Sequence, residues 1–83
     1  MQFPMQIRIS YYAMLREQRG LDEESILVES ADLRELYLRL EKAYGFSLSE
    51  KQVCPAVNDE FCAWERPLAP GDHVVFIPPV AGG

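Results

Sequence analysis

The residues best suited to chemistry stand at the end of the sequence. It closes on Pro78-Pro79-Val80-Ala81-Gly82-Gly83, where two prolines precede a run of small residues. Proline fixes φ and extends the backbone away from the body of a protein, and glycine has no Cβ to obstruct attack on a carboxylate. A tip this slender fits a narrow channel. We therefore interpret Gly83 as an acyl group to be activated and Val80, Ala81 and Gly82 as the segment that is inserted, with an ordinary frayed terminus as the alternative.

The other reactive side chains form no recognisable catalytic set. His73 follows Asp72 and could make an acid–base pair, although a residue in a surface turn is the simpler interpretation. Cys54 has no matching base, and the two cysteines form no metal-binding pattern. If Asn58-Asp59 is a two-residue turn, Cys54 and Cys62 point to opposite faces of a hairpin, so we expect no disulfide and two small core or half-buried thiols.

An acidic run, Asp22-Glu23-Glu24, has two interpretations. It could dock a basic partner, but it is most simply a solvated turn. The glycines are scattered until the end of the sequence, so no glycine-rich phosphate loop is present.

Length and composition favour binding or carrying over catalysis. The sequence has 83 residues and 9.5 kDa, with 48% hydrophobic and 25% charged residues, which is the composition of one small globular domain. An enclosed enzyme pocket would compete with so thin a core for the same side chains. Thirteen Asp and Glu against eight Lys and Arg give a net charge of −5 and no basic run, so we expect no nucleic-acid partner.

Location follows from what the sequence lacks. No apolar run approaches the ~18–20 residues of a membrane span, and Met1-Gln2-Phe3-Pro4-Met5 has no signal-peptide pattern. Two cysteines are too few for a disulfide scaffold. We expect a reduced, cytoplasmic protein without a membrane partner.

The elements that must position the end of the chain are read from periodicity. Residues 5–11 alternate apolar and polar, which predicts a strand with Met5, Ile7, Ile9 and Tyr11 toward the core. A short helical turn over 13–18 ends at Gly20, and a second strand covers 25–29.

A helix is predicted over residues 33–44, because apolar residues recur on one helical face. Asp32 or Ser30 can cap its start, while Gly45 can end it with Phe46 folded back onto the last turn. The members of the apolar face are Leu33, Leu36, Tyr37, Leu40, Ala43 and Tyr44.

A hairpin of residues 53–57 and 61–64 around Asn58-Asp59-Glu60 follows, then a last strand over 73–77. The order ββαβββ describes an α+β roll of the ubiquitin-like, β-grasp kind. We expect a mixed sheet of about five strands with one main helix. Residues 1–79 form this domain, and residues 80–83 are a flexible, extended Gly-Gly tail.

The last strand predicts a docking face. Residues 74–77 point alternately to both faces of the sheet, but the single helix can cover only one. Whichever of Phe76 or Ile77 faces away needs another cover, which a partner could supply; the alternative is that the loops around Leu48 and Leu68 fold over it. The candidate interface residues are Phe61, Trp64, Phe76, Ile77, Pro78 and Pro79.

Several segments resemble the MoaD family, the small sulfur-carrier subunits of molybdopterin synthase. They are Tyr11-Tyr12-Ala13-Met14-Leu15-Arg16-Glu17, Ala56-Val57-Asn58-Asp59-Glu60, Leu68, Gly71-Asp72, Val75-Phe76 and the end of the chain from Pro78 to Gly83. A terminal Gly-Gly is shared with ubiquitin-like modifiers and the thiamine-pathway carrier ThiS, whereas the preceding Pro-Pro-Val-Ala is similar to the molybdopterin branch.

The resemblance implies a function. Gly83 would be adenylated by a MoeB-like enzyme that consumes ATP, then converted to a thiocarboxylate with sulfur from a donor protein. The tail would insert into a MoaE-like large subunit and give its sulfur to cyclic pyranopterin monophosphate, in an assembly that is a dimer of heterodimers. Catalytic groups would belong to the large subunit, and this chain would bind no cofactor or metal. The alternatives are a carrier for thiazole or cysteine synthesis, a ubiquitin-related modifier, or a non-covalent interaction module.

Overall fold

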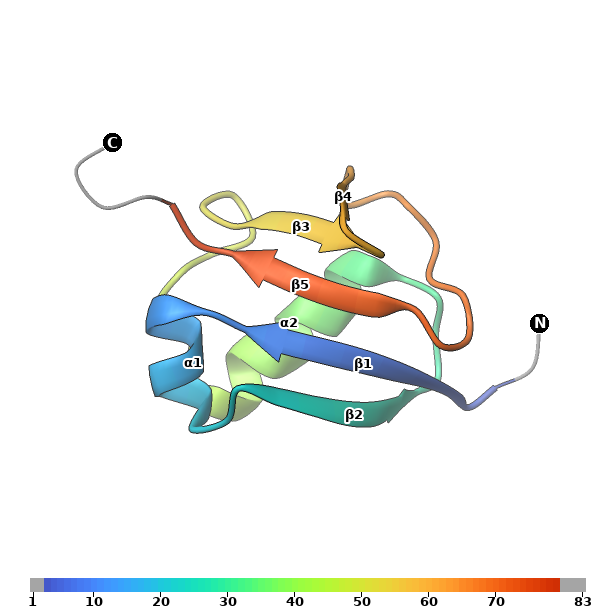
Figure 1. Cartoon of the computed structure of the whole chain (residues 1–83), viewed down its shortest axis with the longest axis horizontal. Helices are drawn as coiled ribbons and strands as arrows, with labels where there is room; N and C mark the ends of the chain where they lie inside the picture. Colours follow the sequence, from blue (N-terminus) through green and yellow to red (C-terminus); the bar gives the residue numbers. More distant parts are fainter. Residues whose placement is uncertain (1–2, 80–83) are drawn as a thin grey trace.

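The computed structural model describes residues 3–79, which form one five-stranded mixed sheet and two helices (Figure 1). Its strands lie in the order β2-β1-β5-β3-β4, with β1 and β5 parallel and the other neighbours antiparallel. This arrangement confirms the predicted β-grasp α+β fold. The elements are β1 (Met5–Tyr11), α1 (Ala13–Arg19), β2 (Glu23–Val28), α2 (Leu33–Tyr44), β3 (Cys54–Val57), β4 (Glu60–Phe61) and β5 (His73–Ile77).

The sheet is built on β1 and β5 at its centre. Alternation along β1 buries Met5, Ile7, Ile9 and Tyr11, as predicted. Figure 1 shows α2 lying across one face of the sheet and α1 at one end of it. The core therefore lies between α2 and that face, and the strand β5 leads from the middle of the sheet to the root of the C-terminal segment.

Helix α2 has the predicted bounds because both ends are capped. The Asp32 carboxylate accepts a hydrogen bond from the Glu35 backbone N–H at 3.0 Å. Gly45 ends the helix at φ 68°, and the Phe46 N–H donates to the Glu41 carbonyl at 3.1 Å, which folds Phe46 into the core. One expectation is wrong: Ala43 is exposed, because Tyr44 makes the last inward contact of the helix.

The acidic run Asp22-Glu23-Glu24 is only partly the expected solvated turn: Asp22 and Glu23 are exposed, but Glu23 and Glu24 belong to β2 and Glu24 is half-buried. β2 begins at Glu23, two residues earlier than predicted, and Ile9 of β1 pairs with Glu24. Strand alternation then turns Glu24 toward the inner face with Ile26 and Val28. Its carboxylate is held there by Arg19 of α1, whose Nε and Nη2 donate to it at 2.8 Å each.

The hairpin has the predicted two-residue turn. Asn58 and Asp59 take φ of 53° and 71°, and Cys62 donates to the Pro55 carbonyl at 3.1 Å, so the two thiols lie on opposite faces and are free. Cys62 is half-buried as expected, but Cys54 is exposed, which corrects its assignment to the core or its margin. The second strand ends at Phe61 instead of Trp64. Within the described chain, no helix is long and apolar enough to cross a membrane.

Candidate functional site

The two faces of β5 differ in what covers them. Val74 and Phe76 point toward α2 and are fully buried, whereas Ile77 points away and is half-buried. The Phe76 ring packs against Tyr37 of α2, with ring centroids 5.0 Å apart, and is stacked on Trp64 at 6.0 Å. Ile77 is therefore the member of the pair that faces away from the helix.

These contacts correct the expected composition of the docking face. Phe76 is inaccessible beneath α2, and Trp64 lies on the same side, because its ring packs on Phe76 and its Nε1–H donates to the Glu50 carbonyl at 3.1 Å. Neither residue can line the uncovered face. Phe61, with an exposed fraction of 69%, and Ile77 remain candidates for it.

The uncovered face carries an apolar surface that we call the open-face patch, made by Tyr12, Ala56, Phe61, Val75 and Ile77. Together with Asp59 these residues line a shallow depression of about 240 Å³. Tyr12 is 53% exposed. The loops around Leu48 and Leu68 do not cover the patch, because both leucines are buried in the core instead.

Sequence reasoning missed three members of the patch, Tyr12, Ala56 and Val75. The period-2 pattern of β1 contained the signal for Tyr12: if Tyr11 faces the core, the next residue faces away. Val75 and Ala56 could be placed only once the register was known, since they pair with each other across β3 and β5.

The C-terminal segment leaves the sheet beside this patch. Cys54 pairs with Ile77 in the last rung of β5, after which Pro78 is half-buried and Pro79 is exposed. We call Pro78-Pro79 the stem. The predicted inserted residues Val80, Ala81 and Gly82 and the predicted acceptor Gly83 lie outside the described residues.

Asp72 and His73, the pair considered in the sequence for acid–base chemistry, each have another hydrogen-bond partner. Asp72 is buried and accepts hydrogen bonds from Asn58 Nδ2 at 2.9 Å and from the Ala69 N–H at 2.8 Å. His73 lies at the start of β5, where its Nε2 is 2.7 Å from Ser10 Oγ. Asp72 and His73 thus have different partners and do not form an acid–base pair. Among residues 3–79, no group of His, Cys, Asp or Glu could hold a metal ion.

Comparison with known proteins places this geometry in a family. The model of the ThiS family matches residues 9–83, which is most of the chain. The chain belongs to the ThiS family. The match includes the segment with Gly82 and Gly83 as well as the strands that form the open-face patch.

Within the ThiS family, the chain is similar to named carriers. It is 32% identical over 83 residues to a molybdopterin synthase sulfur carrier subunit of Chlamydomonas reinhardtii (95% of this chain, 100% of that protein). It is 29% identical over 80 residues to the same subunit of Escherichia coli strain K12 (93% of this chain, 99% of that protein). These relatives confirm the resemblance predicted from the motifs.

Two solved structures of this ThiS-family fold are also similar. A molybdopterin converting factor subunit 1 from Pyrococcus furiosus matches with a TM-score of 0.74 and 30% identity, covering 92% of this chain and 99% of that one. A chain in the complex of subunits 1 and 2 of molybdopterin-converting factor from Helicobacter pylori 26695 matches with a TM-score of 0.65 and 26% identity, covering 95% and 100%.

Proposed function

We propose that the chain is a sulfur carrier in molybdenum cofactor biosynthesis. The observation that carries this proposal is its similarity, over nearly the whole length, to molybdopterin synthase sulfur carrier subunits of two organisms. The reacting group is the carboxylate of Gly83. A carboxylate resists nucleophilic attack until one of its oxygens becomes a good leaving group, and a MoeB-like enzyme supplies that leaving group by adenylation with ATP. A sulfur donor protein then turns the acyl-adenylate into a thiocarboxylate.

The partner that receives the sulfur is the large subunit of molybdopterin synthase. The Helicobacter pylori complex of subunits 1 and 2 supports a partner of this kind. The open-face patch docks against it, while Val80, Ala81, Gly82 and Gly83 reach its active site and deliver sulfur to cyclic pyranopterin monophosphate. The chain acts as a co-substrate, and the large subunit contributes the acid and base groups in a dimer of heterodimers.

Intact mass tests the carrier chemistry. The purified chain is incubated with a MoeB-like enzyme, ATP and a sulfur donor, and we expect a gain equal to the replacement of one oxygen by sulfur, localised to Gly83. A variant without Gly83, and one with residues added after it, should show no gain. Both should melt near the temperature of the wild type, because the last few residues of most domains contribute little to stability.

The outcomes of this experiment are distinct. A wild-type chain that gains no sulfur would contradict the carrier function and favour a non-covalent interaction module. A chain that gains sulfur but does not pass it to cyclic pyranopterin monophosphate with the large subunit would be a carrier for another pathway or a protein modifier. A large fall in melting temperature on removal of Gly83 would mean that the segment is structural.

A further inference from the structure

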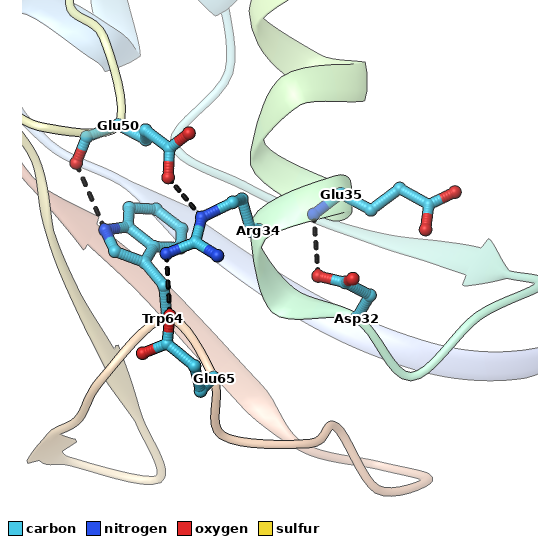
Figure 2. Close-up of polar contacts among 6 residues, drawn as sticks. All are labelled: Asp32, Arg34, Glu35, Glu50, Trp64 and Glu65. Atoms are coloured by element: carbon cyan, nitrogen blue, oxygen red, sulfur yellow. Dashed lines mark hydrogen bonds and ion pairs between the residues drawn. The ribbon is translucent and has the colours of Figure 1, made fainter.

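Arg34 joins two loops that are far apart in the sequence. It lies in the first turn of α2, and Figure 2 shows its guanidinium between two carboxylates. Its Nε donates to Glu50 in the connection from α2 to β3, and its Nη2 donates to Glu65 in the connection from β4 to β5, at 2.8 Å. The fork of donors that an arginine carries lets one side chain hold both loops at once.

Trp64 makes a second link between the same two loops. This residue precedes Glu65, and its Nε1–H donates to the backbone carbonyl of Glu50 at 3.1 Å (Figure 2). The two loops are thus joined twice, once through the Arg34 guanidinium and once through the Trp64 indole. We call Arg34, Glu50, Trp64 and Glu65 the strap.

The strap packs against the end of β5 through Trp64. The Trp64 ring stacks on Phe76, with planes 17° apart and centroids at 6.0 Å, and it also packs on Tyr37 at 5.5 Å. Phe76 is the last residue of β5 that pairs with β1, through Tyr11. Beyond it Ile77 pairs only with Cys54 of β3, so this final rung is supported from one side of β5 alone.

The strap also constrains the segment that leads to Cys54, the β3 residue of this rung. Glu50 lies four residues before Cys54 and is fixed both by its carboxylate and by its carbonyl. The rung Cys54–Ile77 is therefore bounded by Glu50 on the β3 side and by Trp64 over Phe76 on the β5 side. The stem begins directly after this rung.

We propose that Arg34 is a positioning residue for the C-terminal segment: through Glu50, Glu65 and Trp64 it fixes the last rung of β5 and so the direction in which the stem leaves the sheet. This inference rests on the proposed function, because direction matters only if the segment must present its end group to a partner's active site. A misplacement of about 1 Å at a reacting group can lower a rate about 100-fold.

Exposure separates this role from a general contribution to stability. The side chains of Arg34, Glu50 and Glu65 are 41%, 26% and 71% exposed, and ion pairs that reach solvent in this way add little to the free energy of unfolding. Their loss should loosen the rung locally without unfolding the domain. The hydrogen bond from Arg34 lowers the pKa of Glu65, so this carboxylate stays charged to a more acid pH than a free glutamate does.

The test compares Arg34→Gln with Arg39→Gln. Arg39 is a matched control because it is an exposed arginine of the same helix whose Nη1 donates to the Leu27 carbonyl on the opposite edge of the sheet. Backbone hydrogen exchange at Ile77 and Cys54 should rise about tenfold in Arg34→Gln and stay unchanged in Arg39→Gln. Exchange at Ile7, in the centre of β1, should be the same in both variants.

The second readout is sulfur transfer in the complete complex with the large subunit. Arg34→Gln should lower kcat about tenfold or more and leave the Kd for the large subunit within about twofold, because Phe61 and Tyr12, the most exposed members of the open-face patch, lie outside the last rung. Arg34→Lys keeps the charge but not the fork, so it should recover only part of kcat.

Each outcome decides a separate statement. Equal exchange at Ile77 in the Arg34→Gln and Arg39→Gln variants would overturn the strap, and faster exchange with an unchanged kcat would overturn the positioning role. A wild-type chain that carries no sulfur would overturn the proposed function together with any role in transfer. The exchange comparison would even then decide whether the strap holds the last rung.

Discussion

Glu24 accepts hydrogen bonds from two elements at once. Arg19 of α1 donates to both carboxylate oxygens at 2.8 Å, and the Tyr11 hydroxyl of β1 donates to one of them at 2.6 Å. The hydrogen bond from Arg19 lowers the pKa of Glu24 against the opposing effect of burial. Burial, reinforced by Glu24, raises the pKa of Tyr11, which therefore remains a donor. The Arg19 guanidinium also lies 3.9 Å from the centre of the Tyr44 ring, so the cluster ties α1 to α2 as well.

The first prediction concerns Glu24→Gln. A carboxylate whose pKa is lower in the folded state contributes stability that is present above the unfolded value, about 4.3, and is lost as pH falls through the folded pKa. We expect the variant to lose about 1–3 kcal/mol of unfolding free energy at pH 7. The gap to wild type should narrow at acid pH, where wild-type Glu24 is also neutral. Urea unfolding of the wild type and of Glu24→Gln, at pH 7 and at acid pH, measures the difference in unfolding free energy.

The control for this prediction is Glu29→Gln. Glu29 is exposed directly after β2, so its replacement should change stability by less than about 0.5 kcal/mol at either pH. A pH-independent loss in Glu24→Gln would mean that the packing of this side chain matters and its charge does not.

At the scale of elements, the turn between β3 and β4 is fastened to the start of β5. Asn58 accepts a hydrogen bond from the His73 N–H at 3.0 Å through Oδ1 and donates from Nδ2 to the buried Asp72 at 2.9 Å. Asn58 and Asp59 both have positive φ, a conformation that asparagine and aspartate tolerate better than most residues. The turn therefore fixes the hairpin and the turn before β5 together.

The second prediction compares two changes in this turn. Asn58→Gly also suits positive φ but removes both side-chain hydrogen bonds and leaves Asp72 short of a donor, so it should cost about 1–3 kcal/mol of unfolding free energy. Asp59→Gly keeps those bonds and suits positive φ, so it should change stability by less than about 1 kcal/mol. Thermal unfolding of the two variants gives the comparison; similar losses would show that the turn conformation, and not the Asn58 bonds, is what matters.

Local signals explain which elements could be predicted from the sequence. Helix α2 was predictable to the residue because its caps, Asp32 and Gly45, act on their immediate neighbours. The end of the hairpin was not: Phe61 to Trp64 has a strand-like composition, but Trp64 is drawn to the helix side by Phe76, twelve residues later. The start of β2 was missed because charged residues resemble a turn unless the partner of Glu24 is known.

The residues of the candidate site were likewise predictable only where the signal is local. Ile77 and Phe61 were among the candidates because alternation and hydrophobicity are visible in the sequence, but separating them from Phe76 and Trp64 needed the register and the packing against α2. The strap was not predicted, since Arg34 is 16 residues from Glu50 and 31 from Glu65, and nothing local marks either pair. Pairing at such separations is decided by the packing of whole elements.

At the scale of the whole molecule, the open-face patch should behave as one interface. Phe61→Asp should weaken binding to the large subunit by at least about 2 kcal/mol, because aromatic anchors in apolar patches dominate such interfaces. Leu27→Asp makes a similar change at an exposed leucine (58%) on the far edge strand and should have little effect. Titration calorimetry checks both variants. If Phe61→Asp and Leu27→Asp weakened binding equally, the interface would lie elsewhere. If Phe61→Asp left binding unchanged, recognition would rest on the C-terminal segment.

The net charge of −5 leads to a prediction about association rates. An acidic carrier should be steered toward basic partner surfaces, so its rate of association should fall severalfold between low and physiological salt while its dissociation rate changes less. Stopped-flow mixing with the large subunit over a salt series measures both rates. Association that does not depend on salt would leave the acidic excess with a role in solubility only.

The parallel pairing of β1 and β5 also has a mechanical consequence. The two strands lie side by side from Arg8–His73 to Tyr11–Phe76, and β1 begins and β5 ends at opposite ends of the sheet (Figure 1). A pull on the stem along β5 therefore loads its hydrogen bonds to β1 and β3 in shear, so that they must yield together, whereas peeling a strand sideways breaks such bonds one at a time. The sheet thus resists a force along β5 better than a force across it.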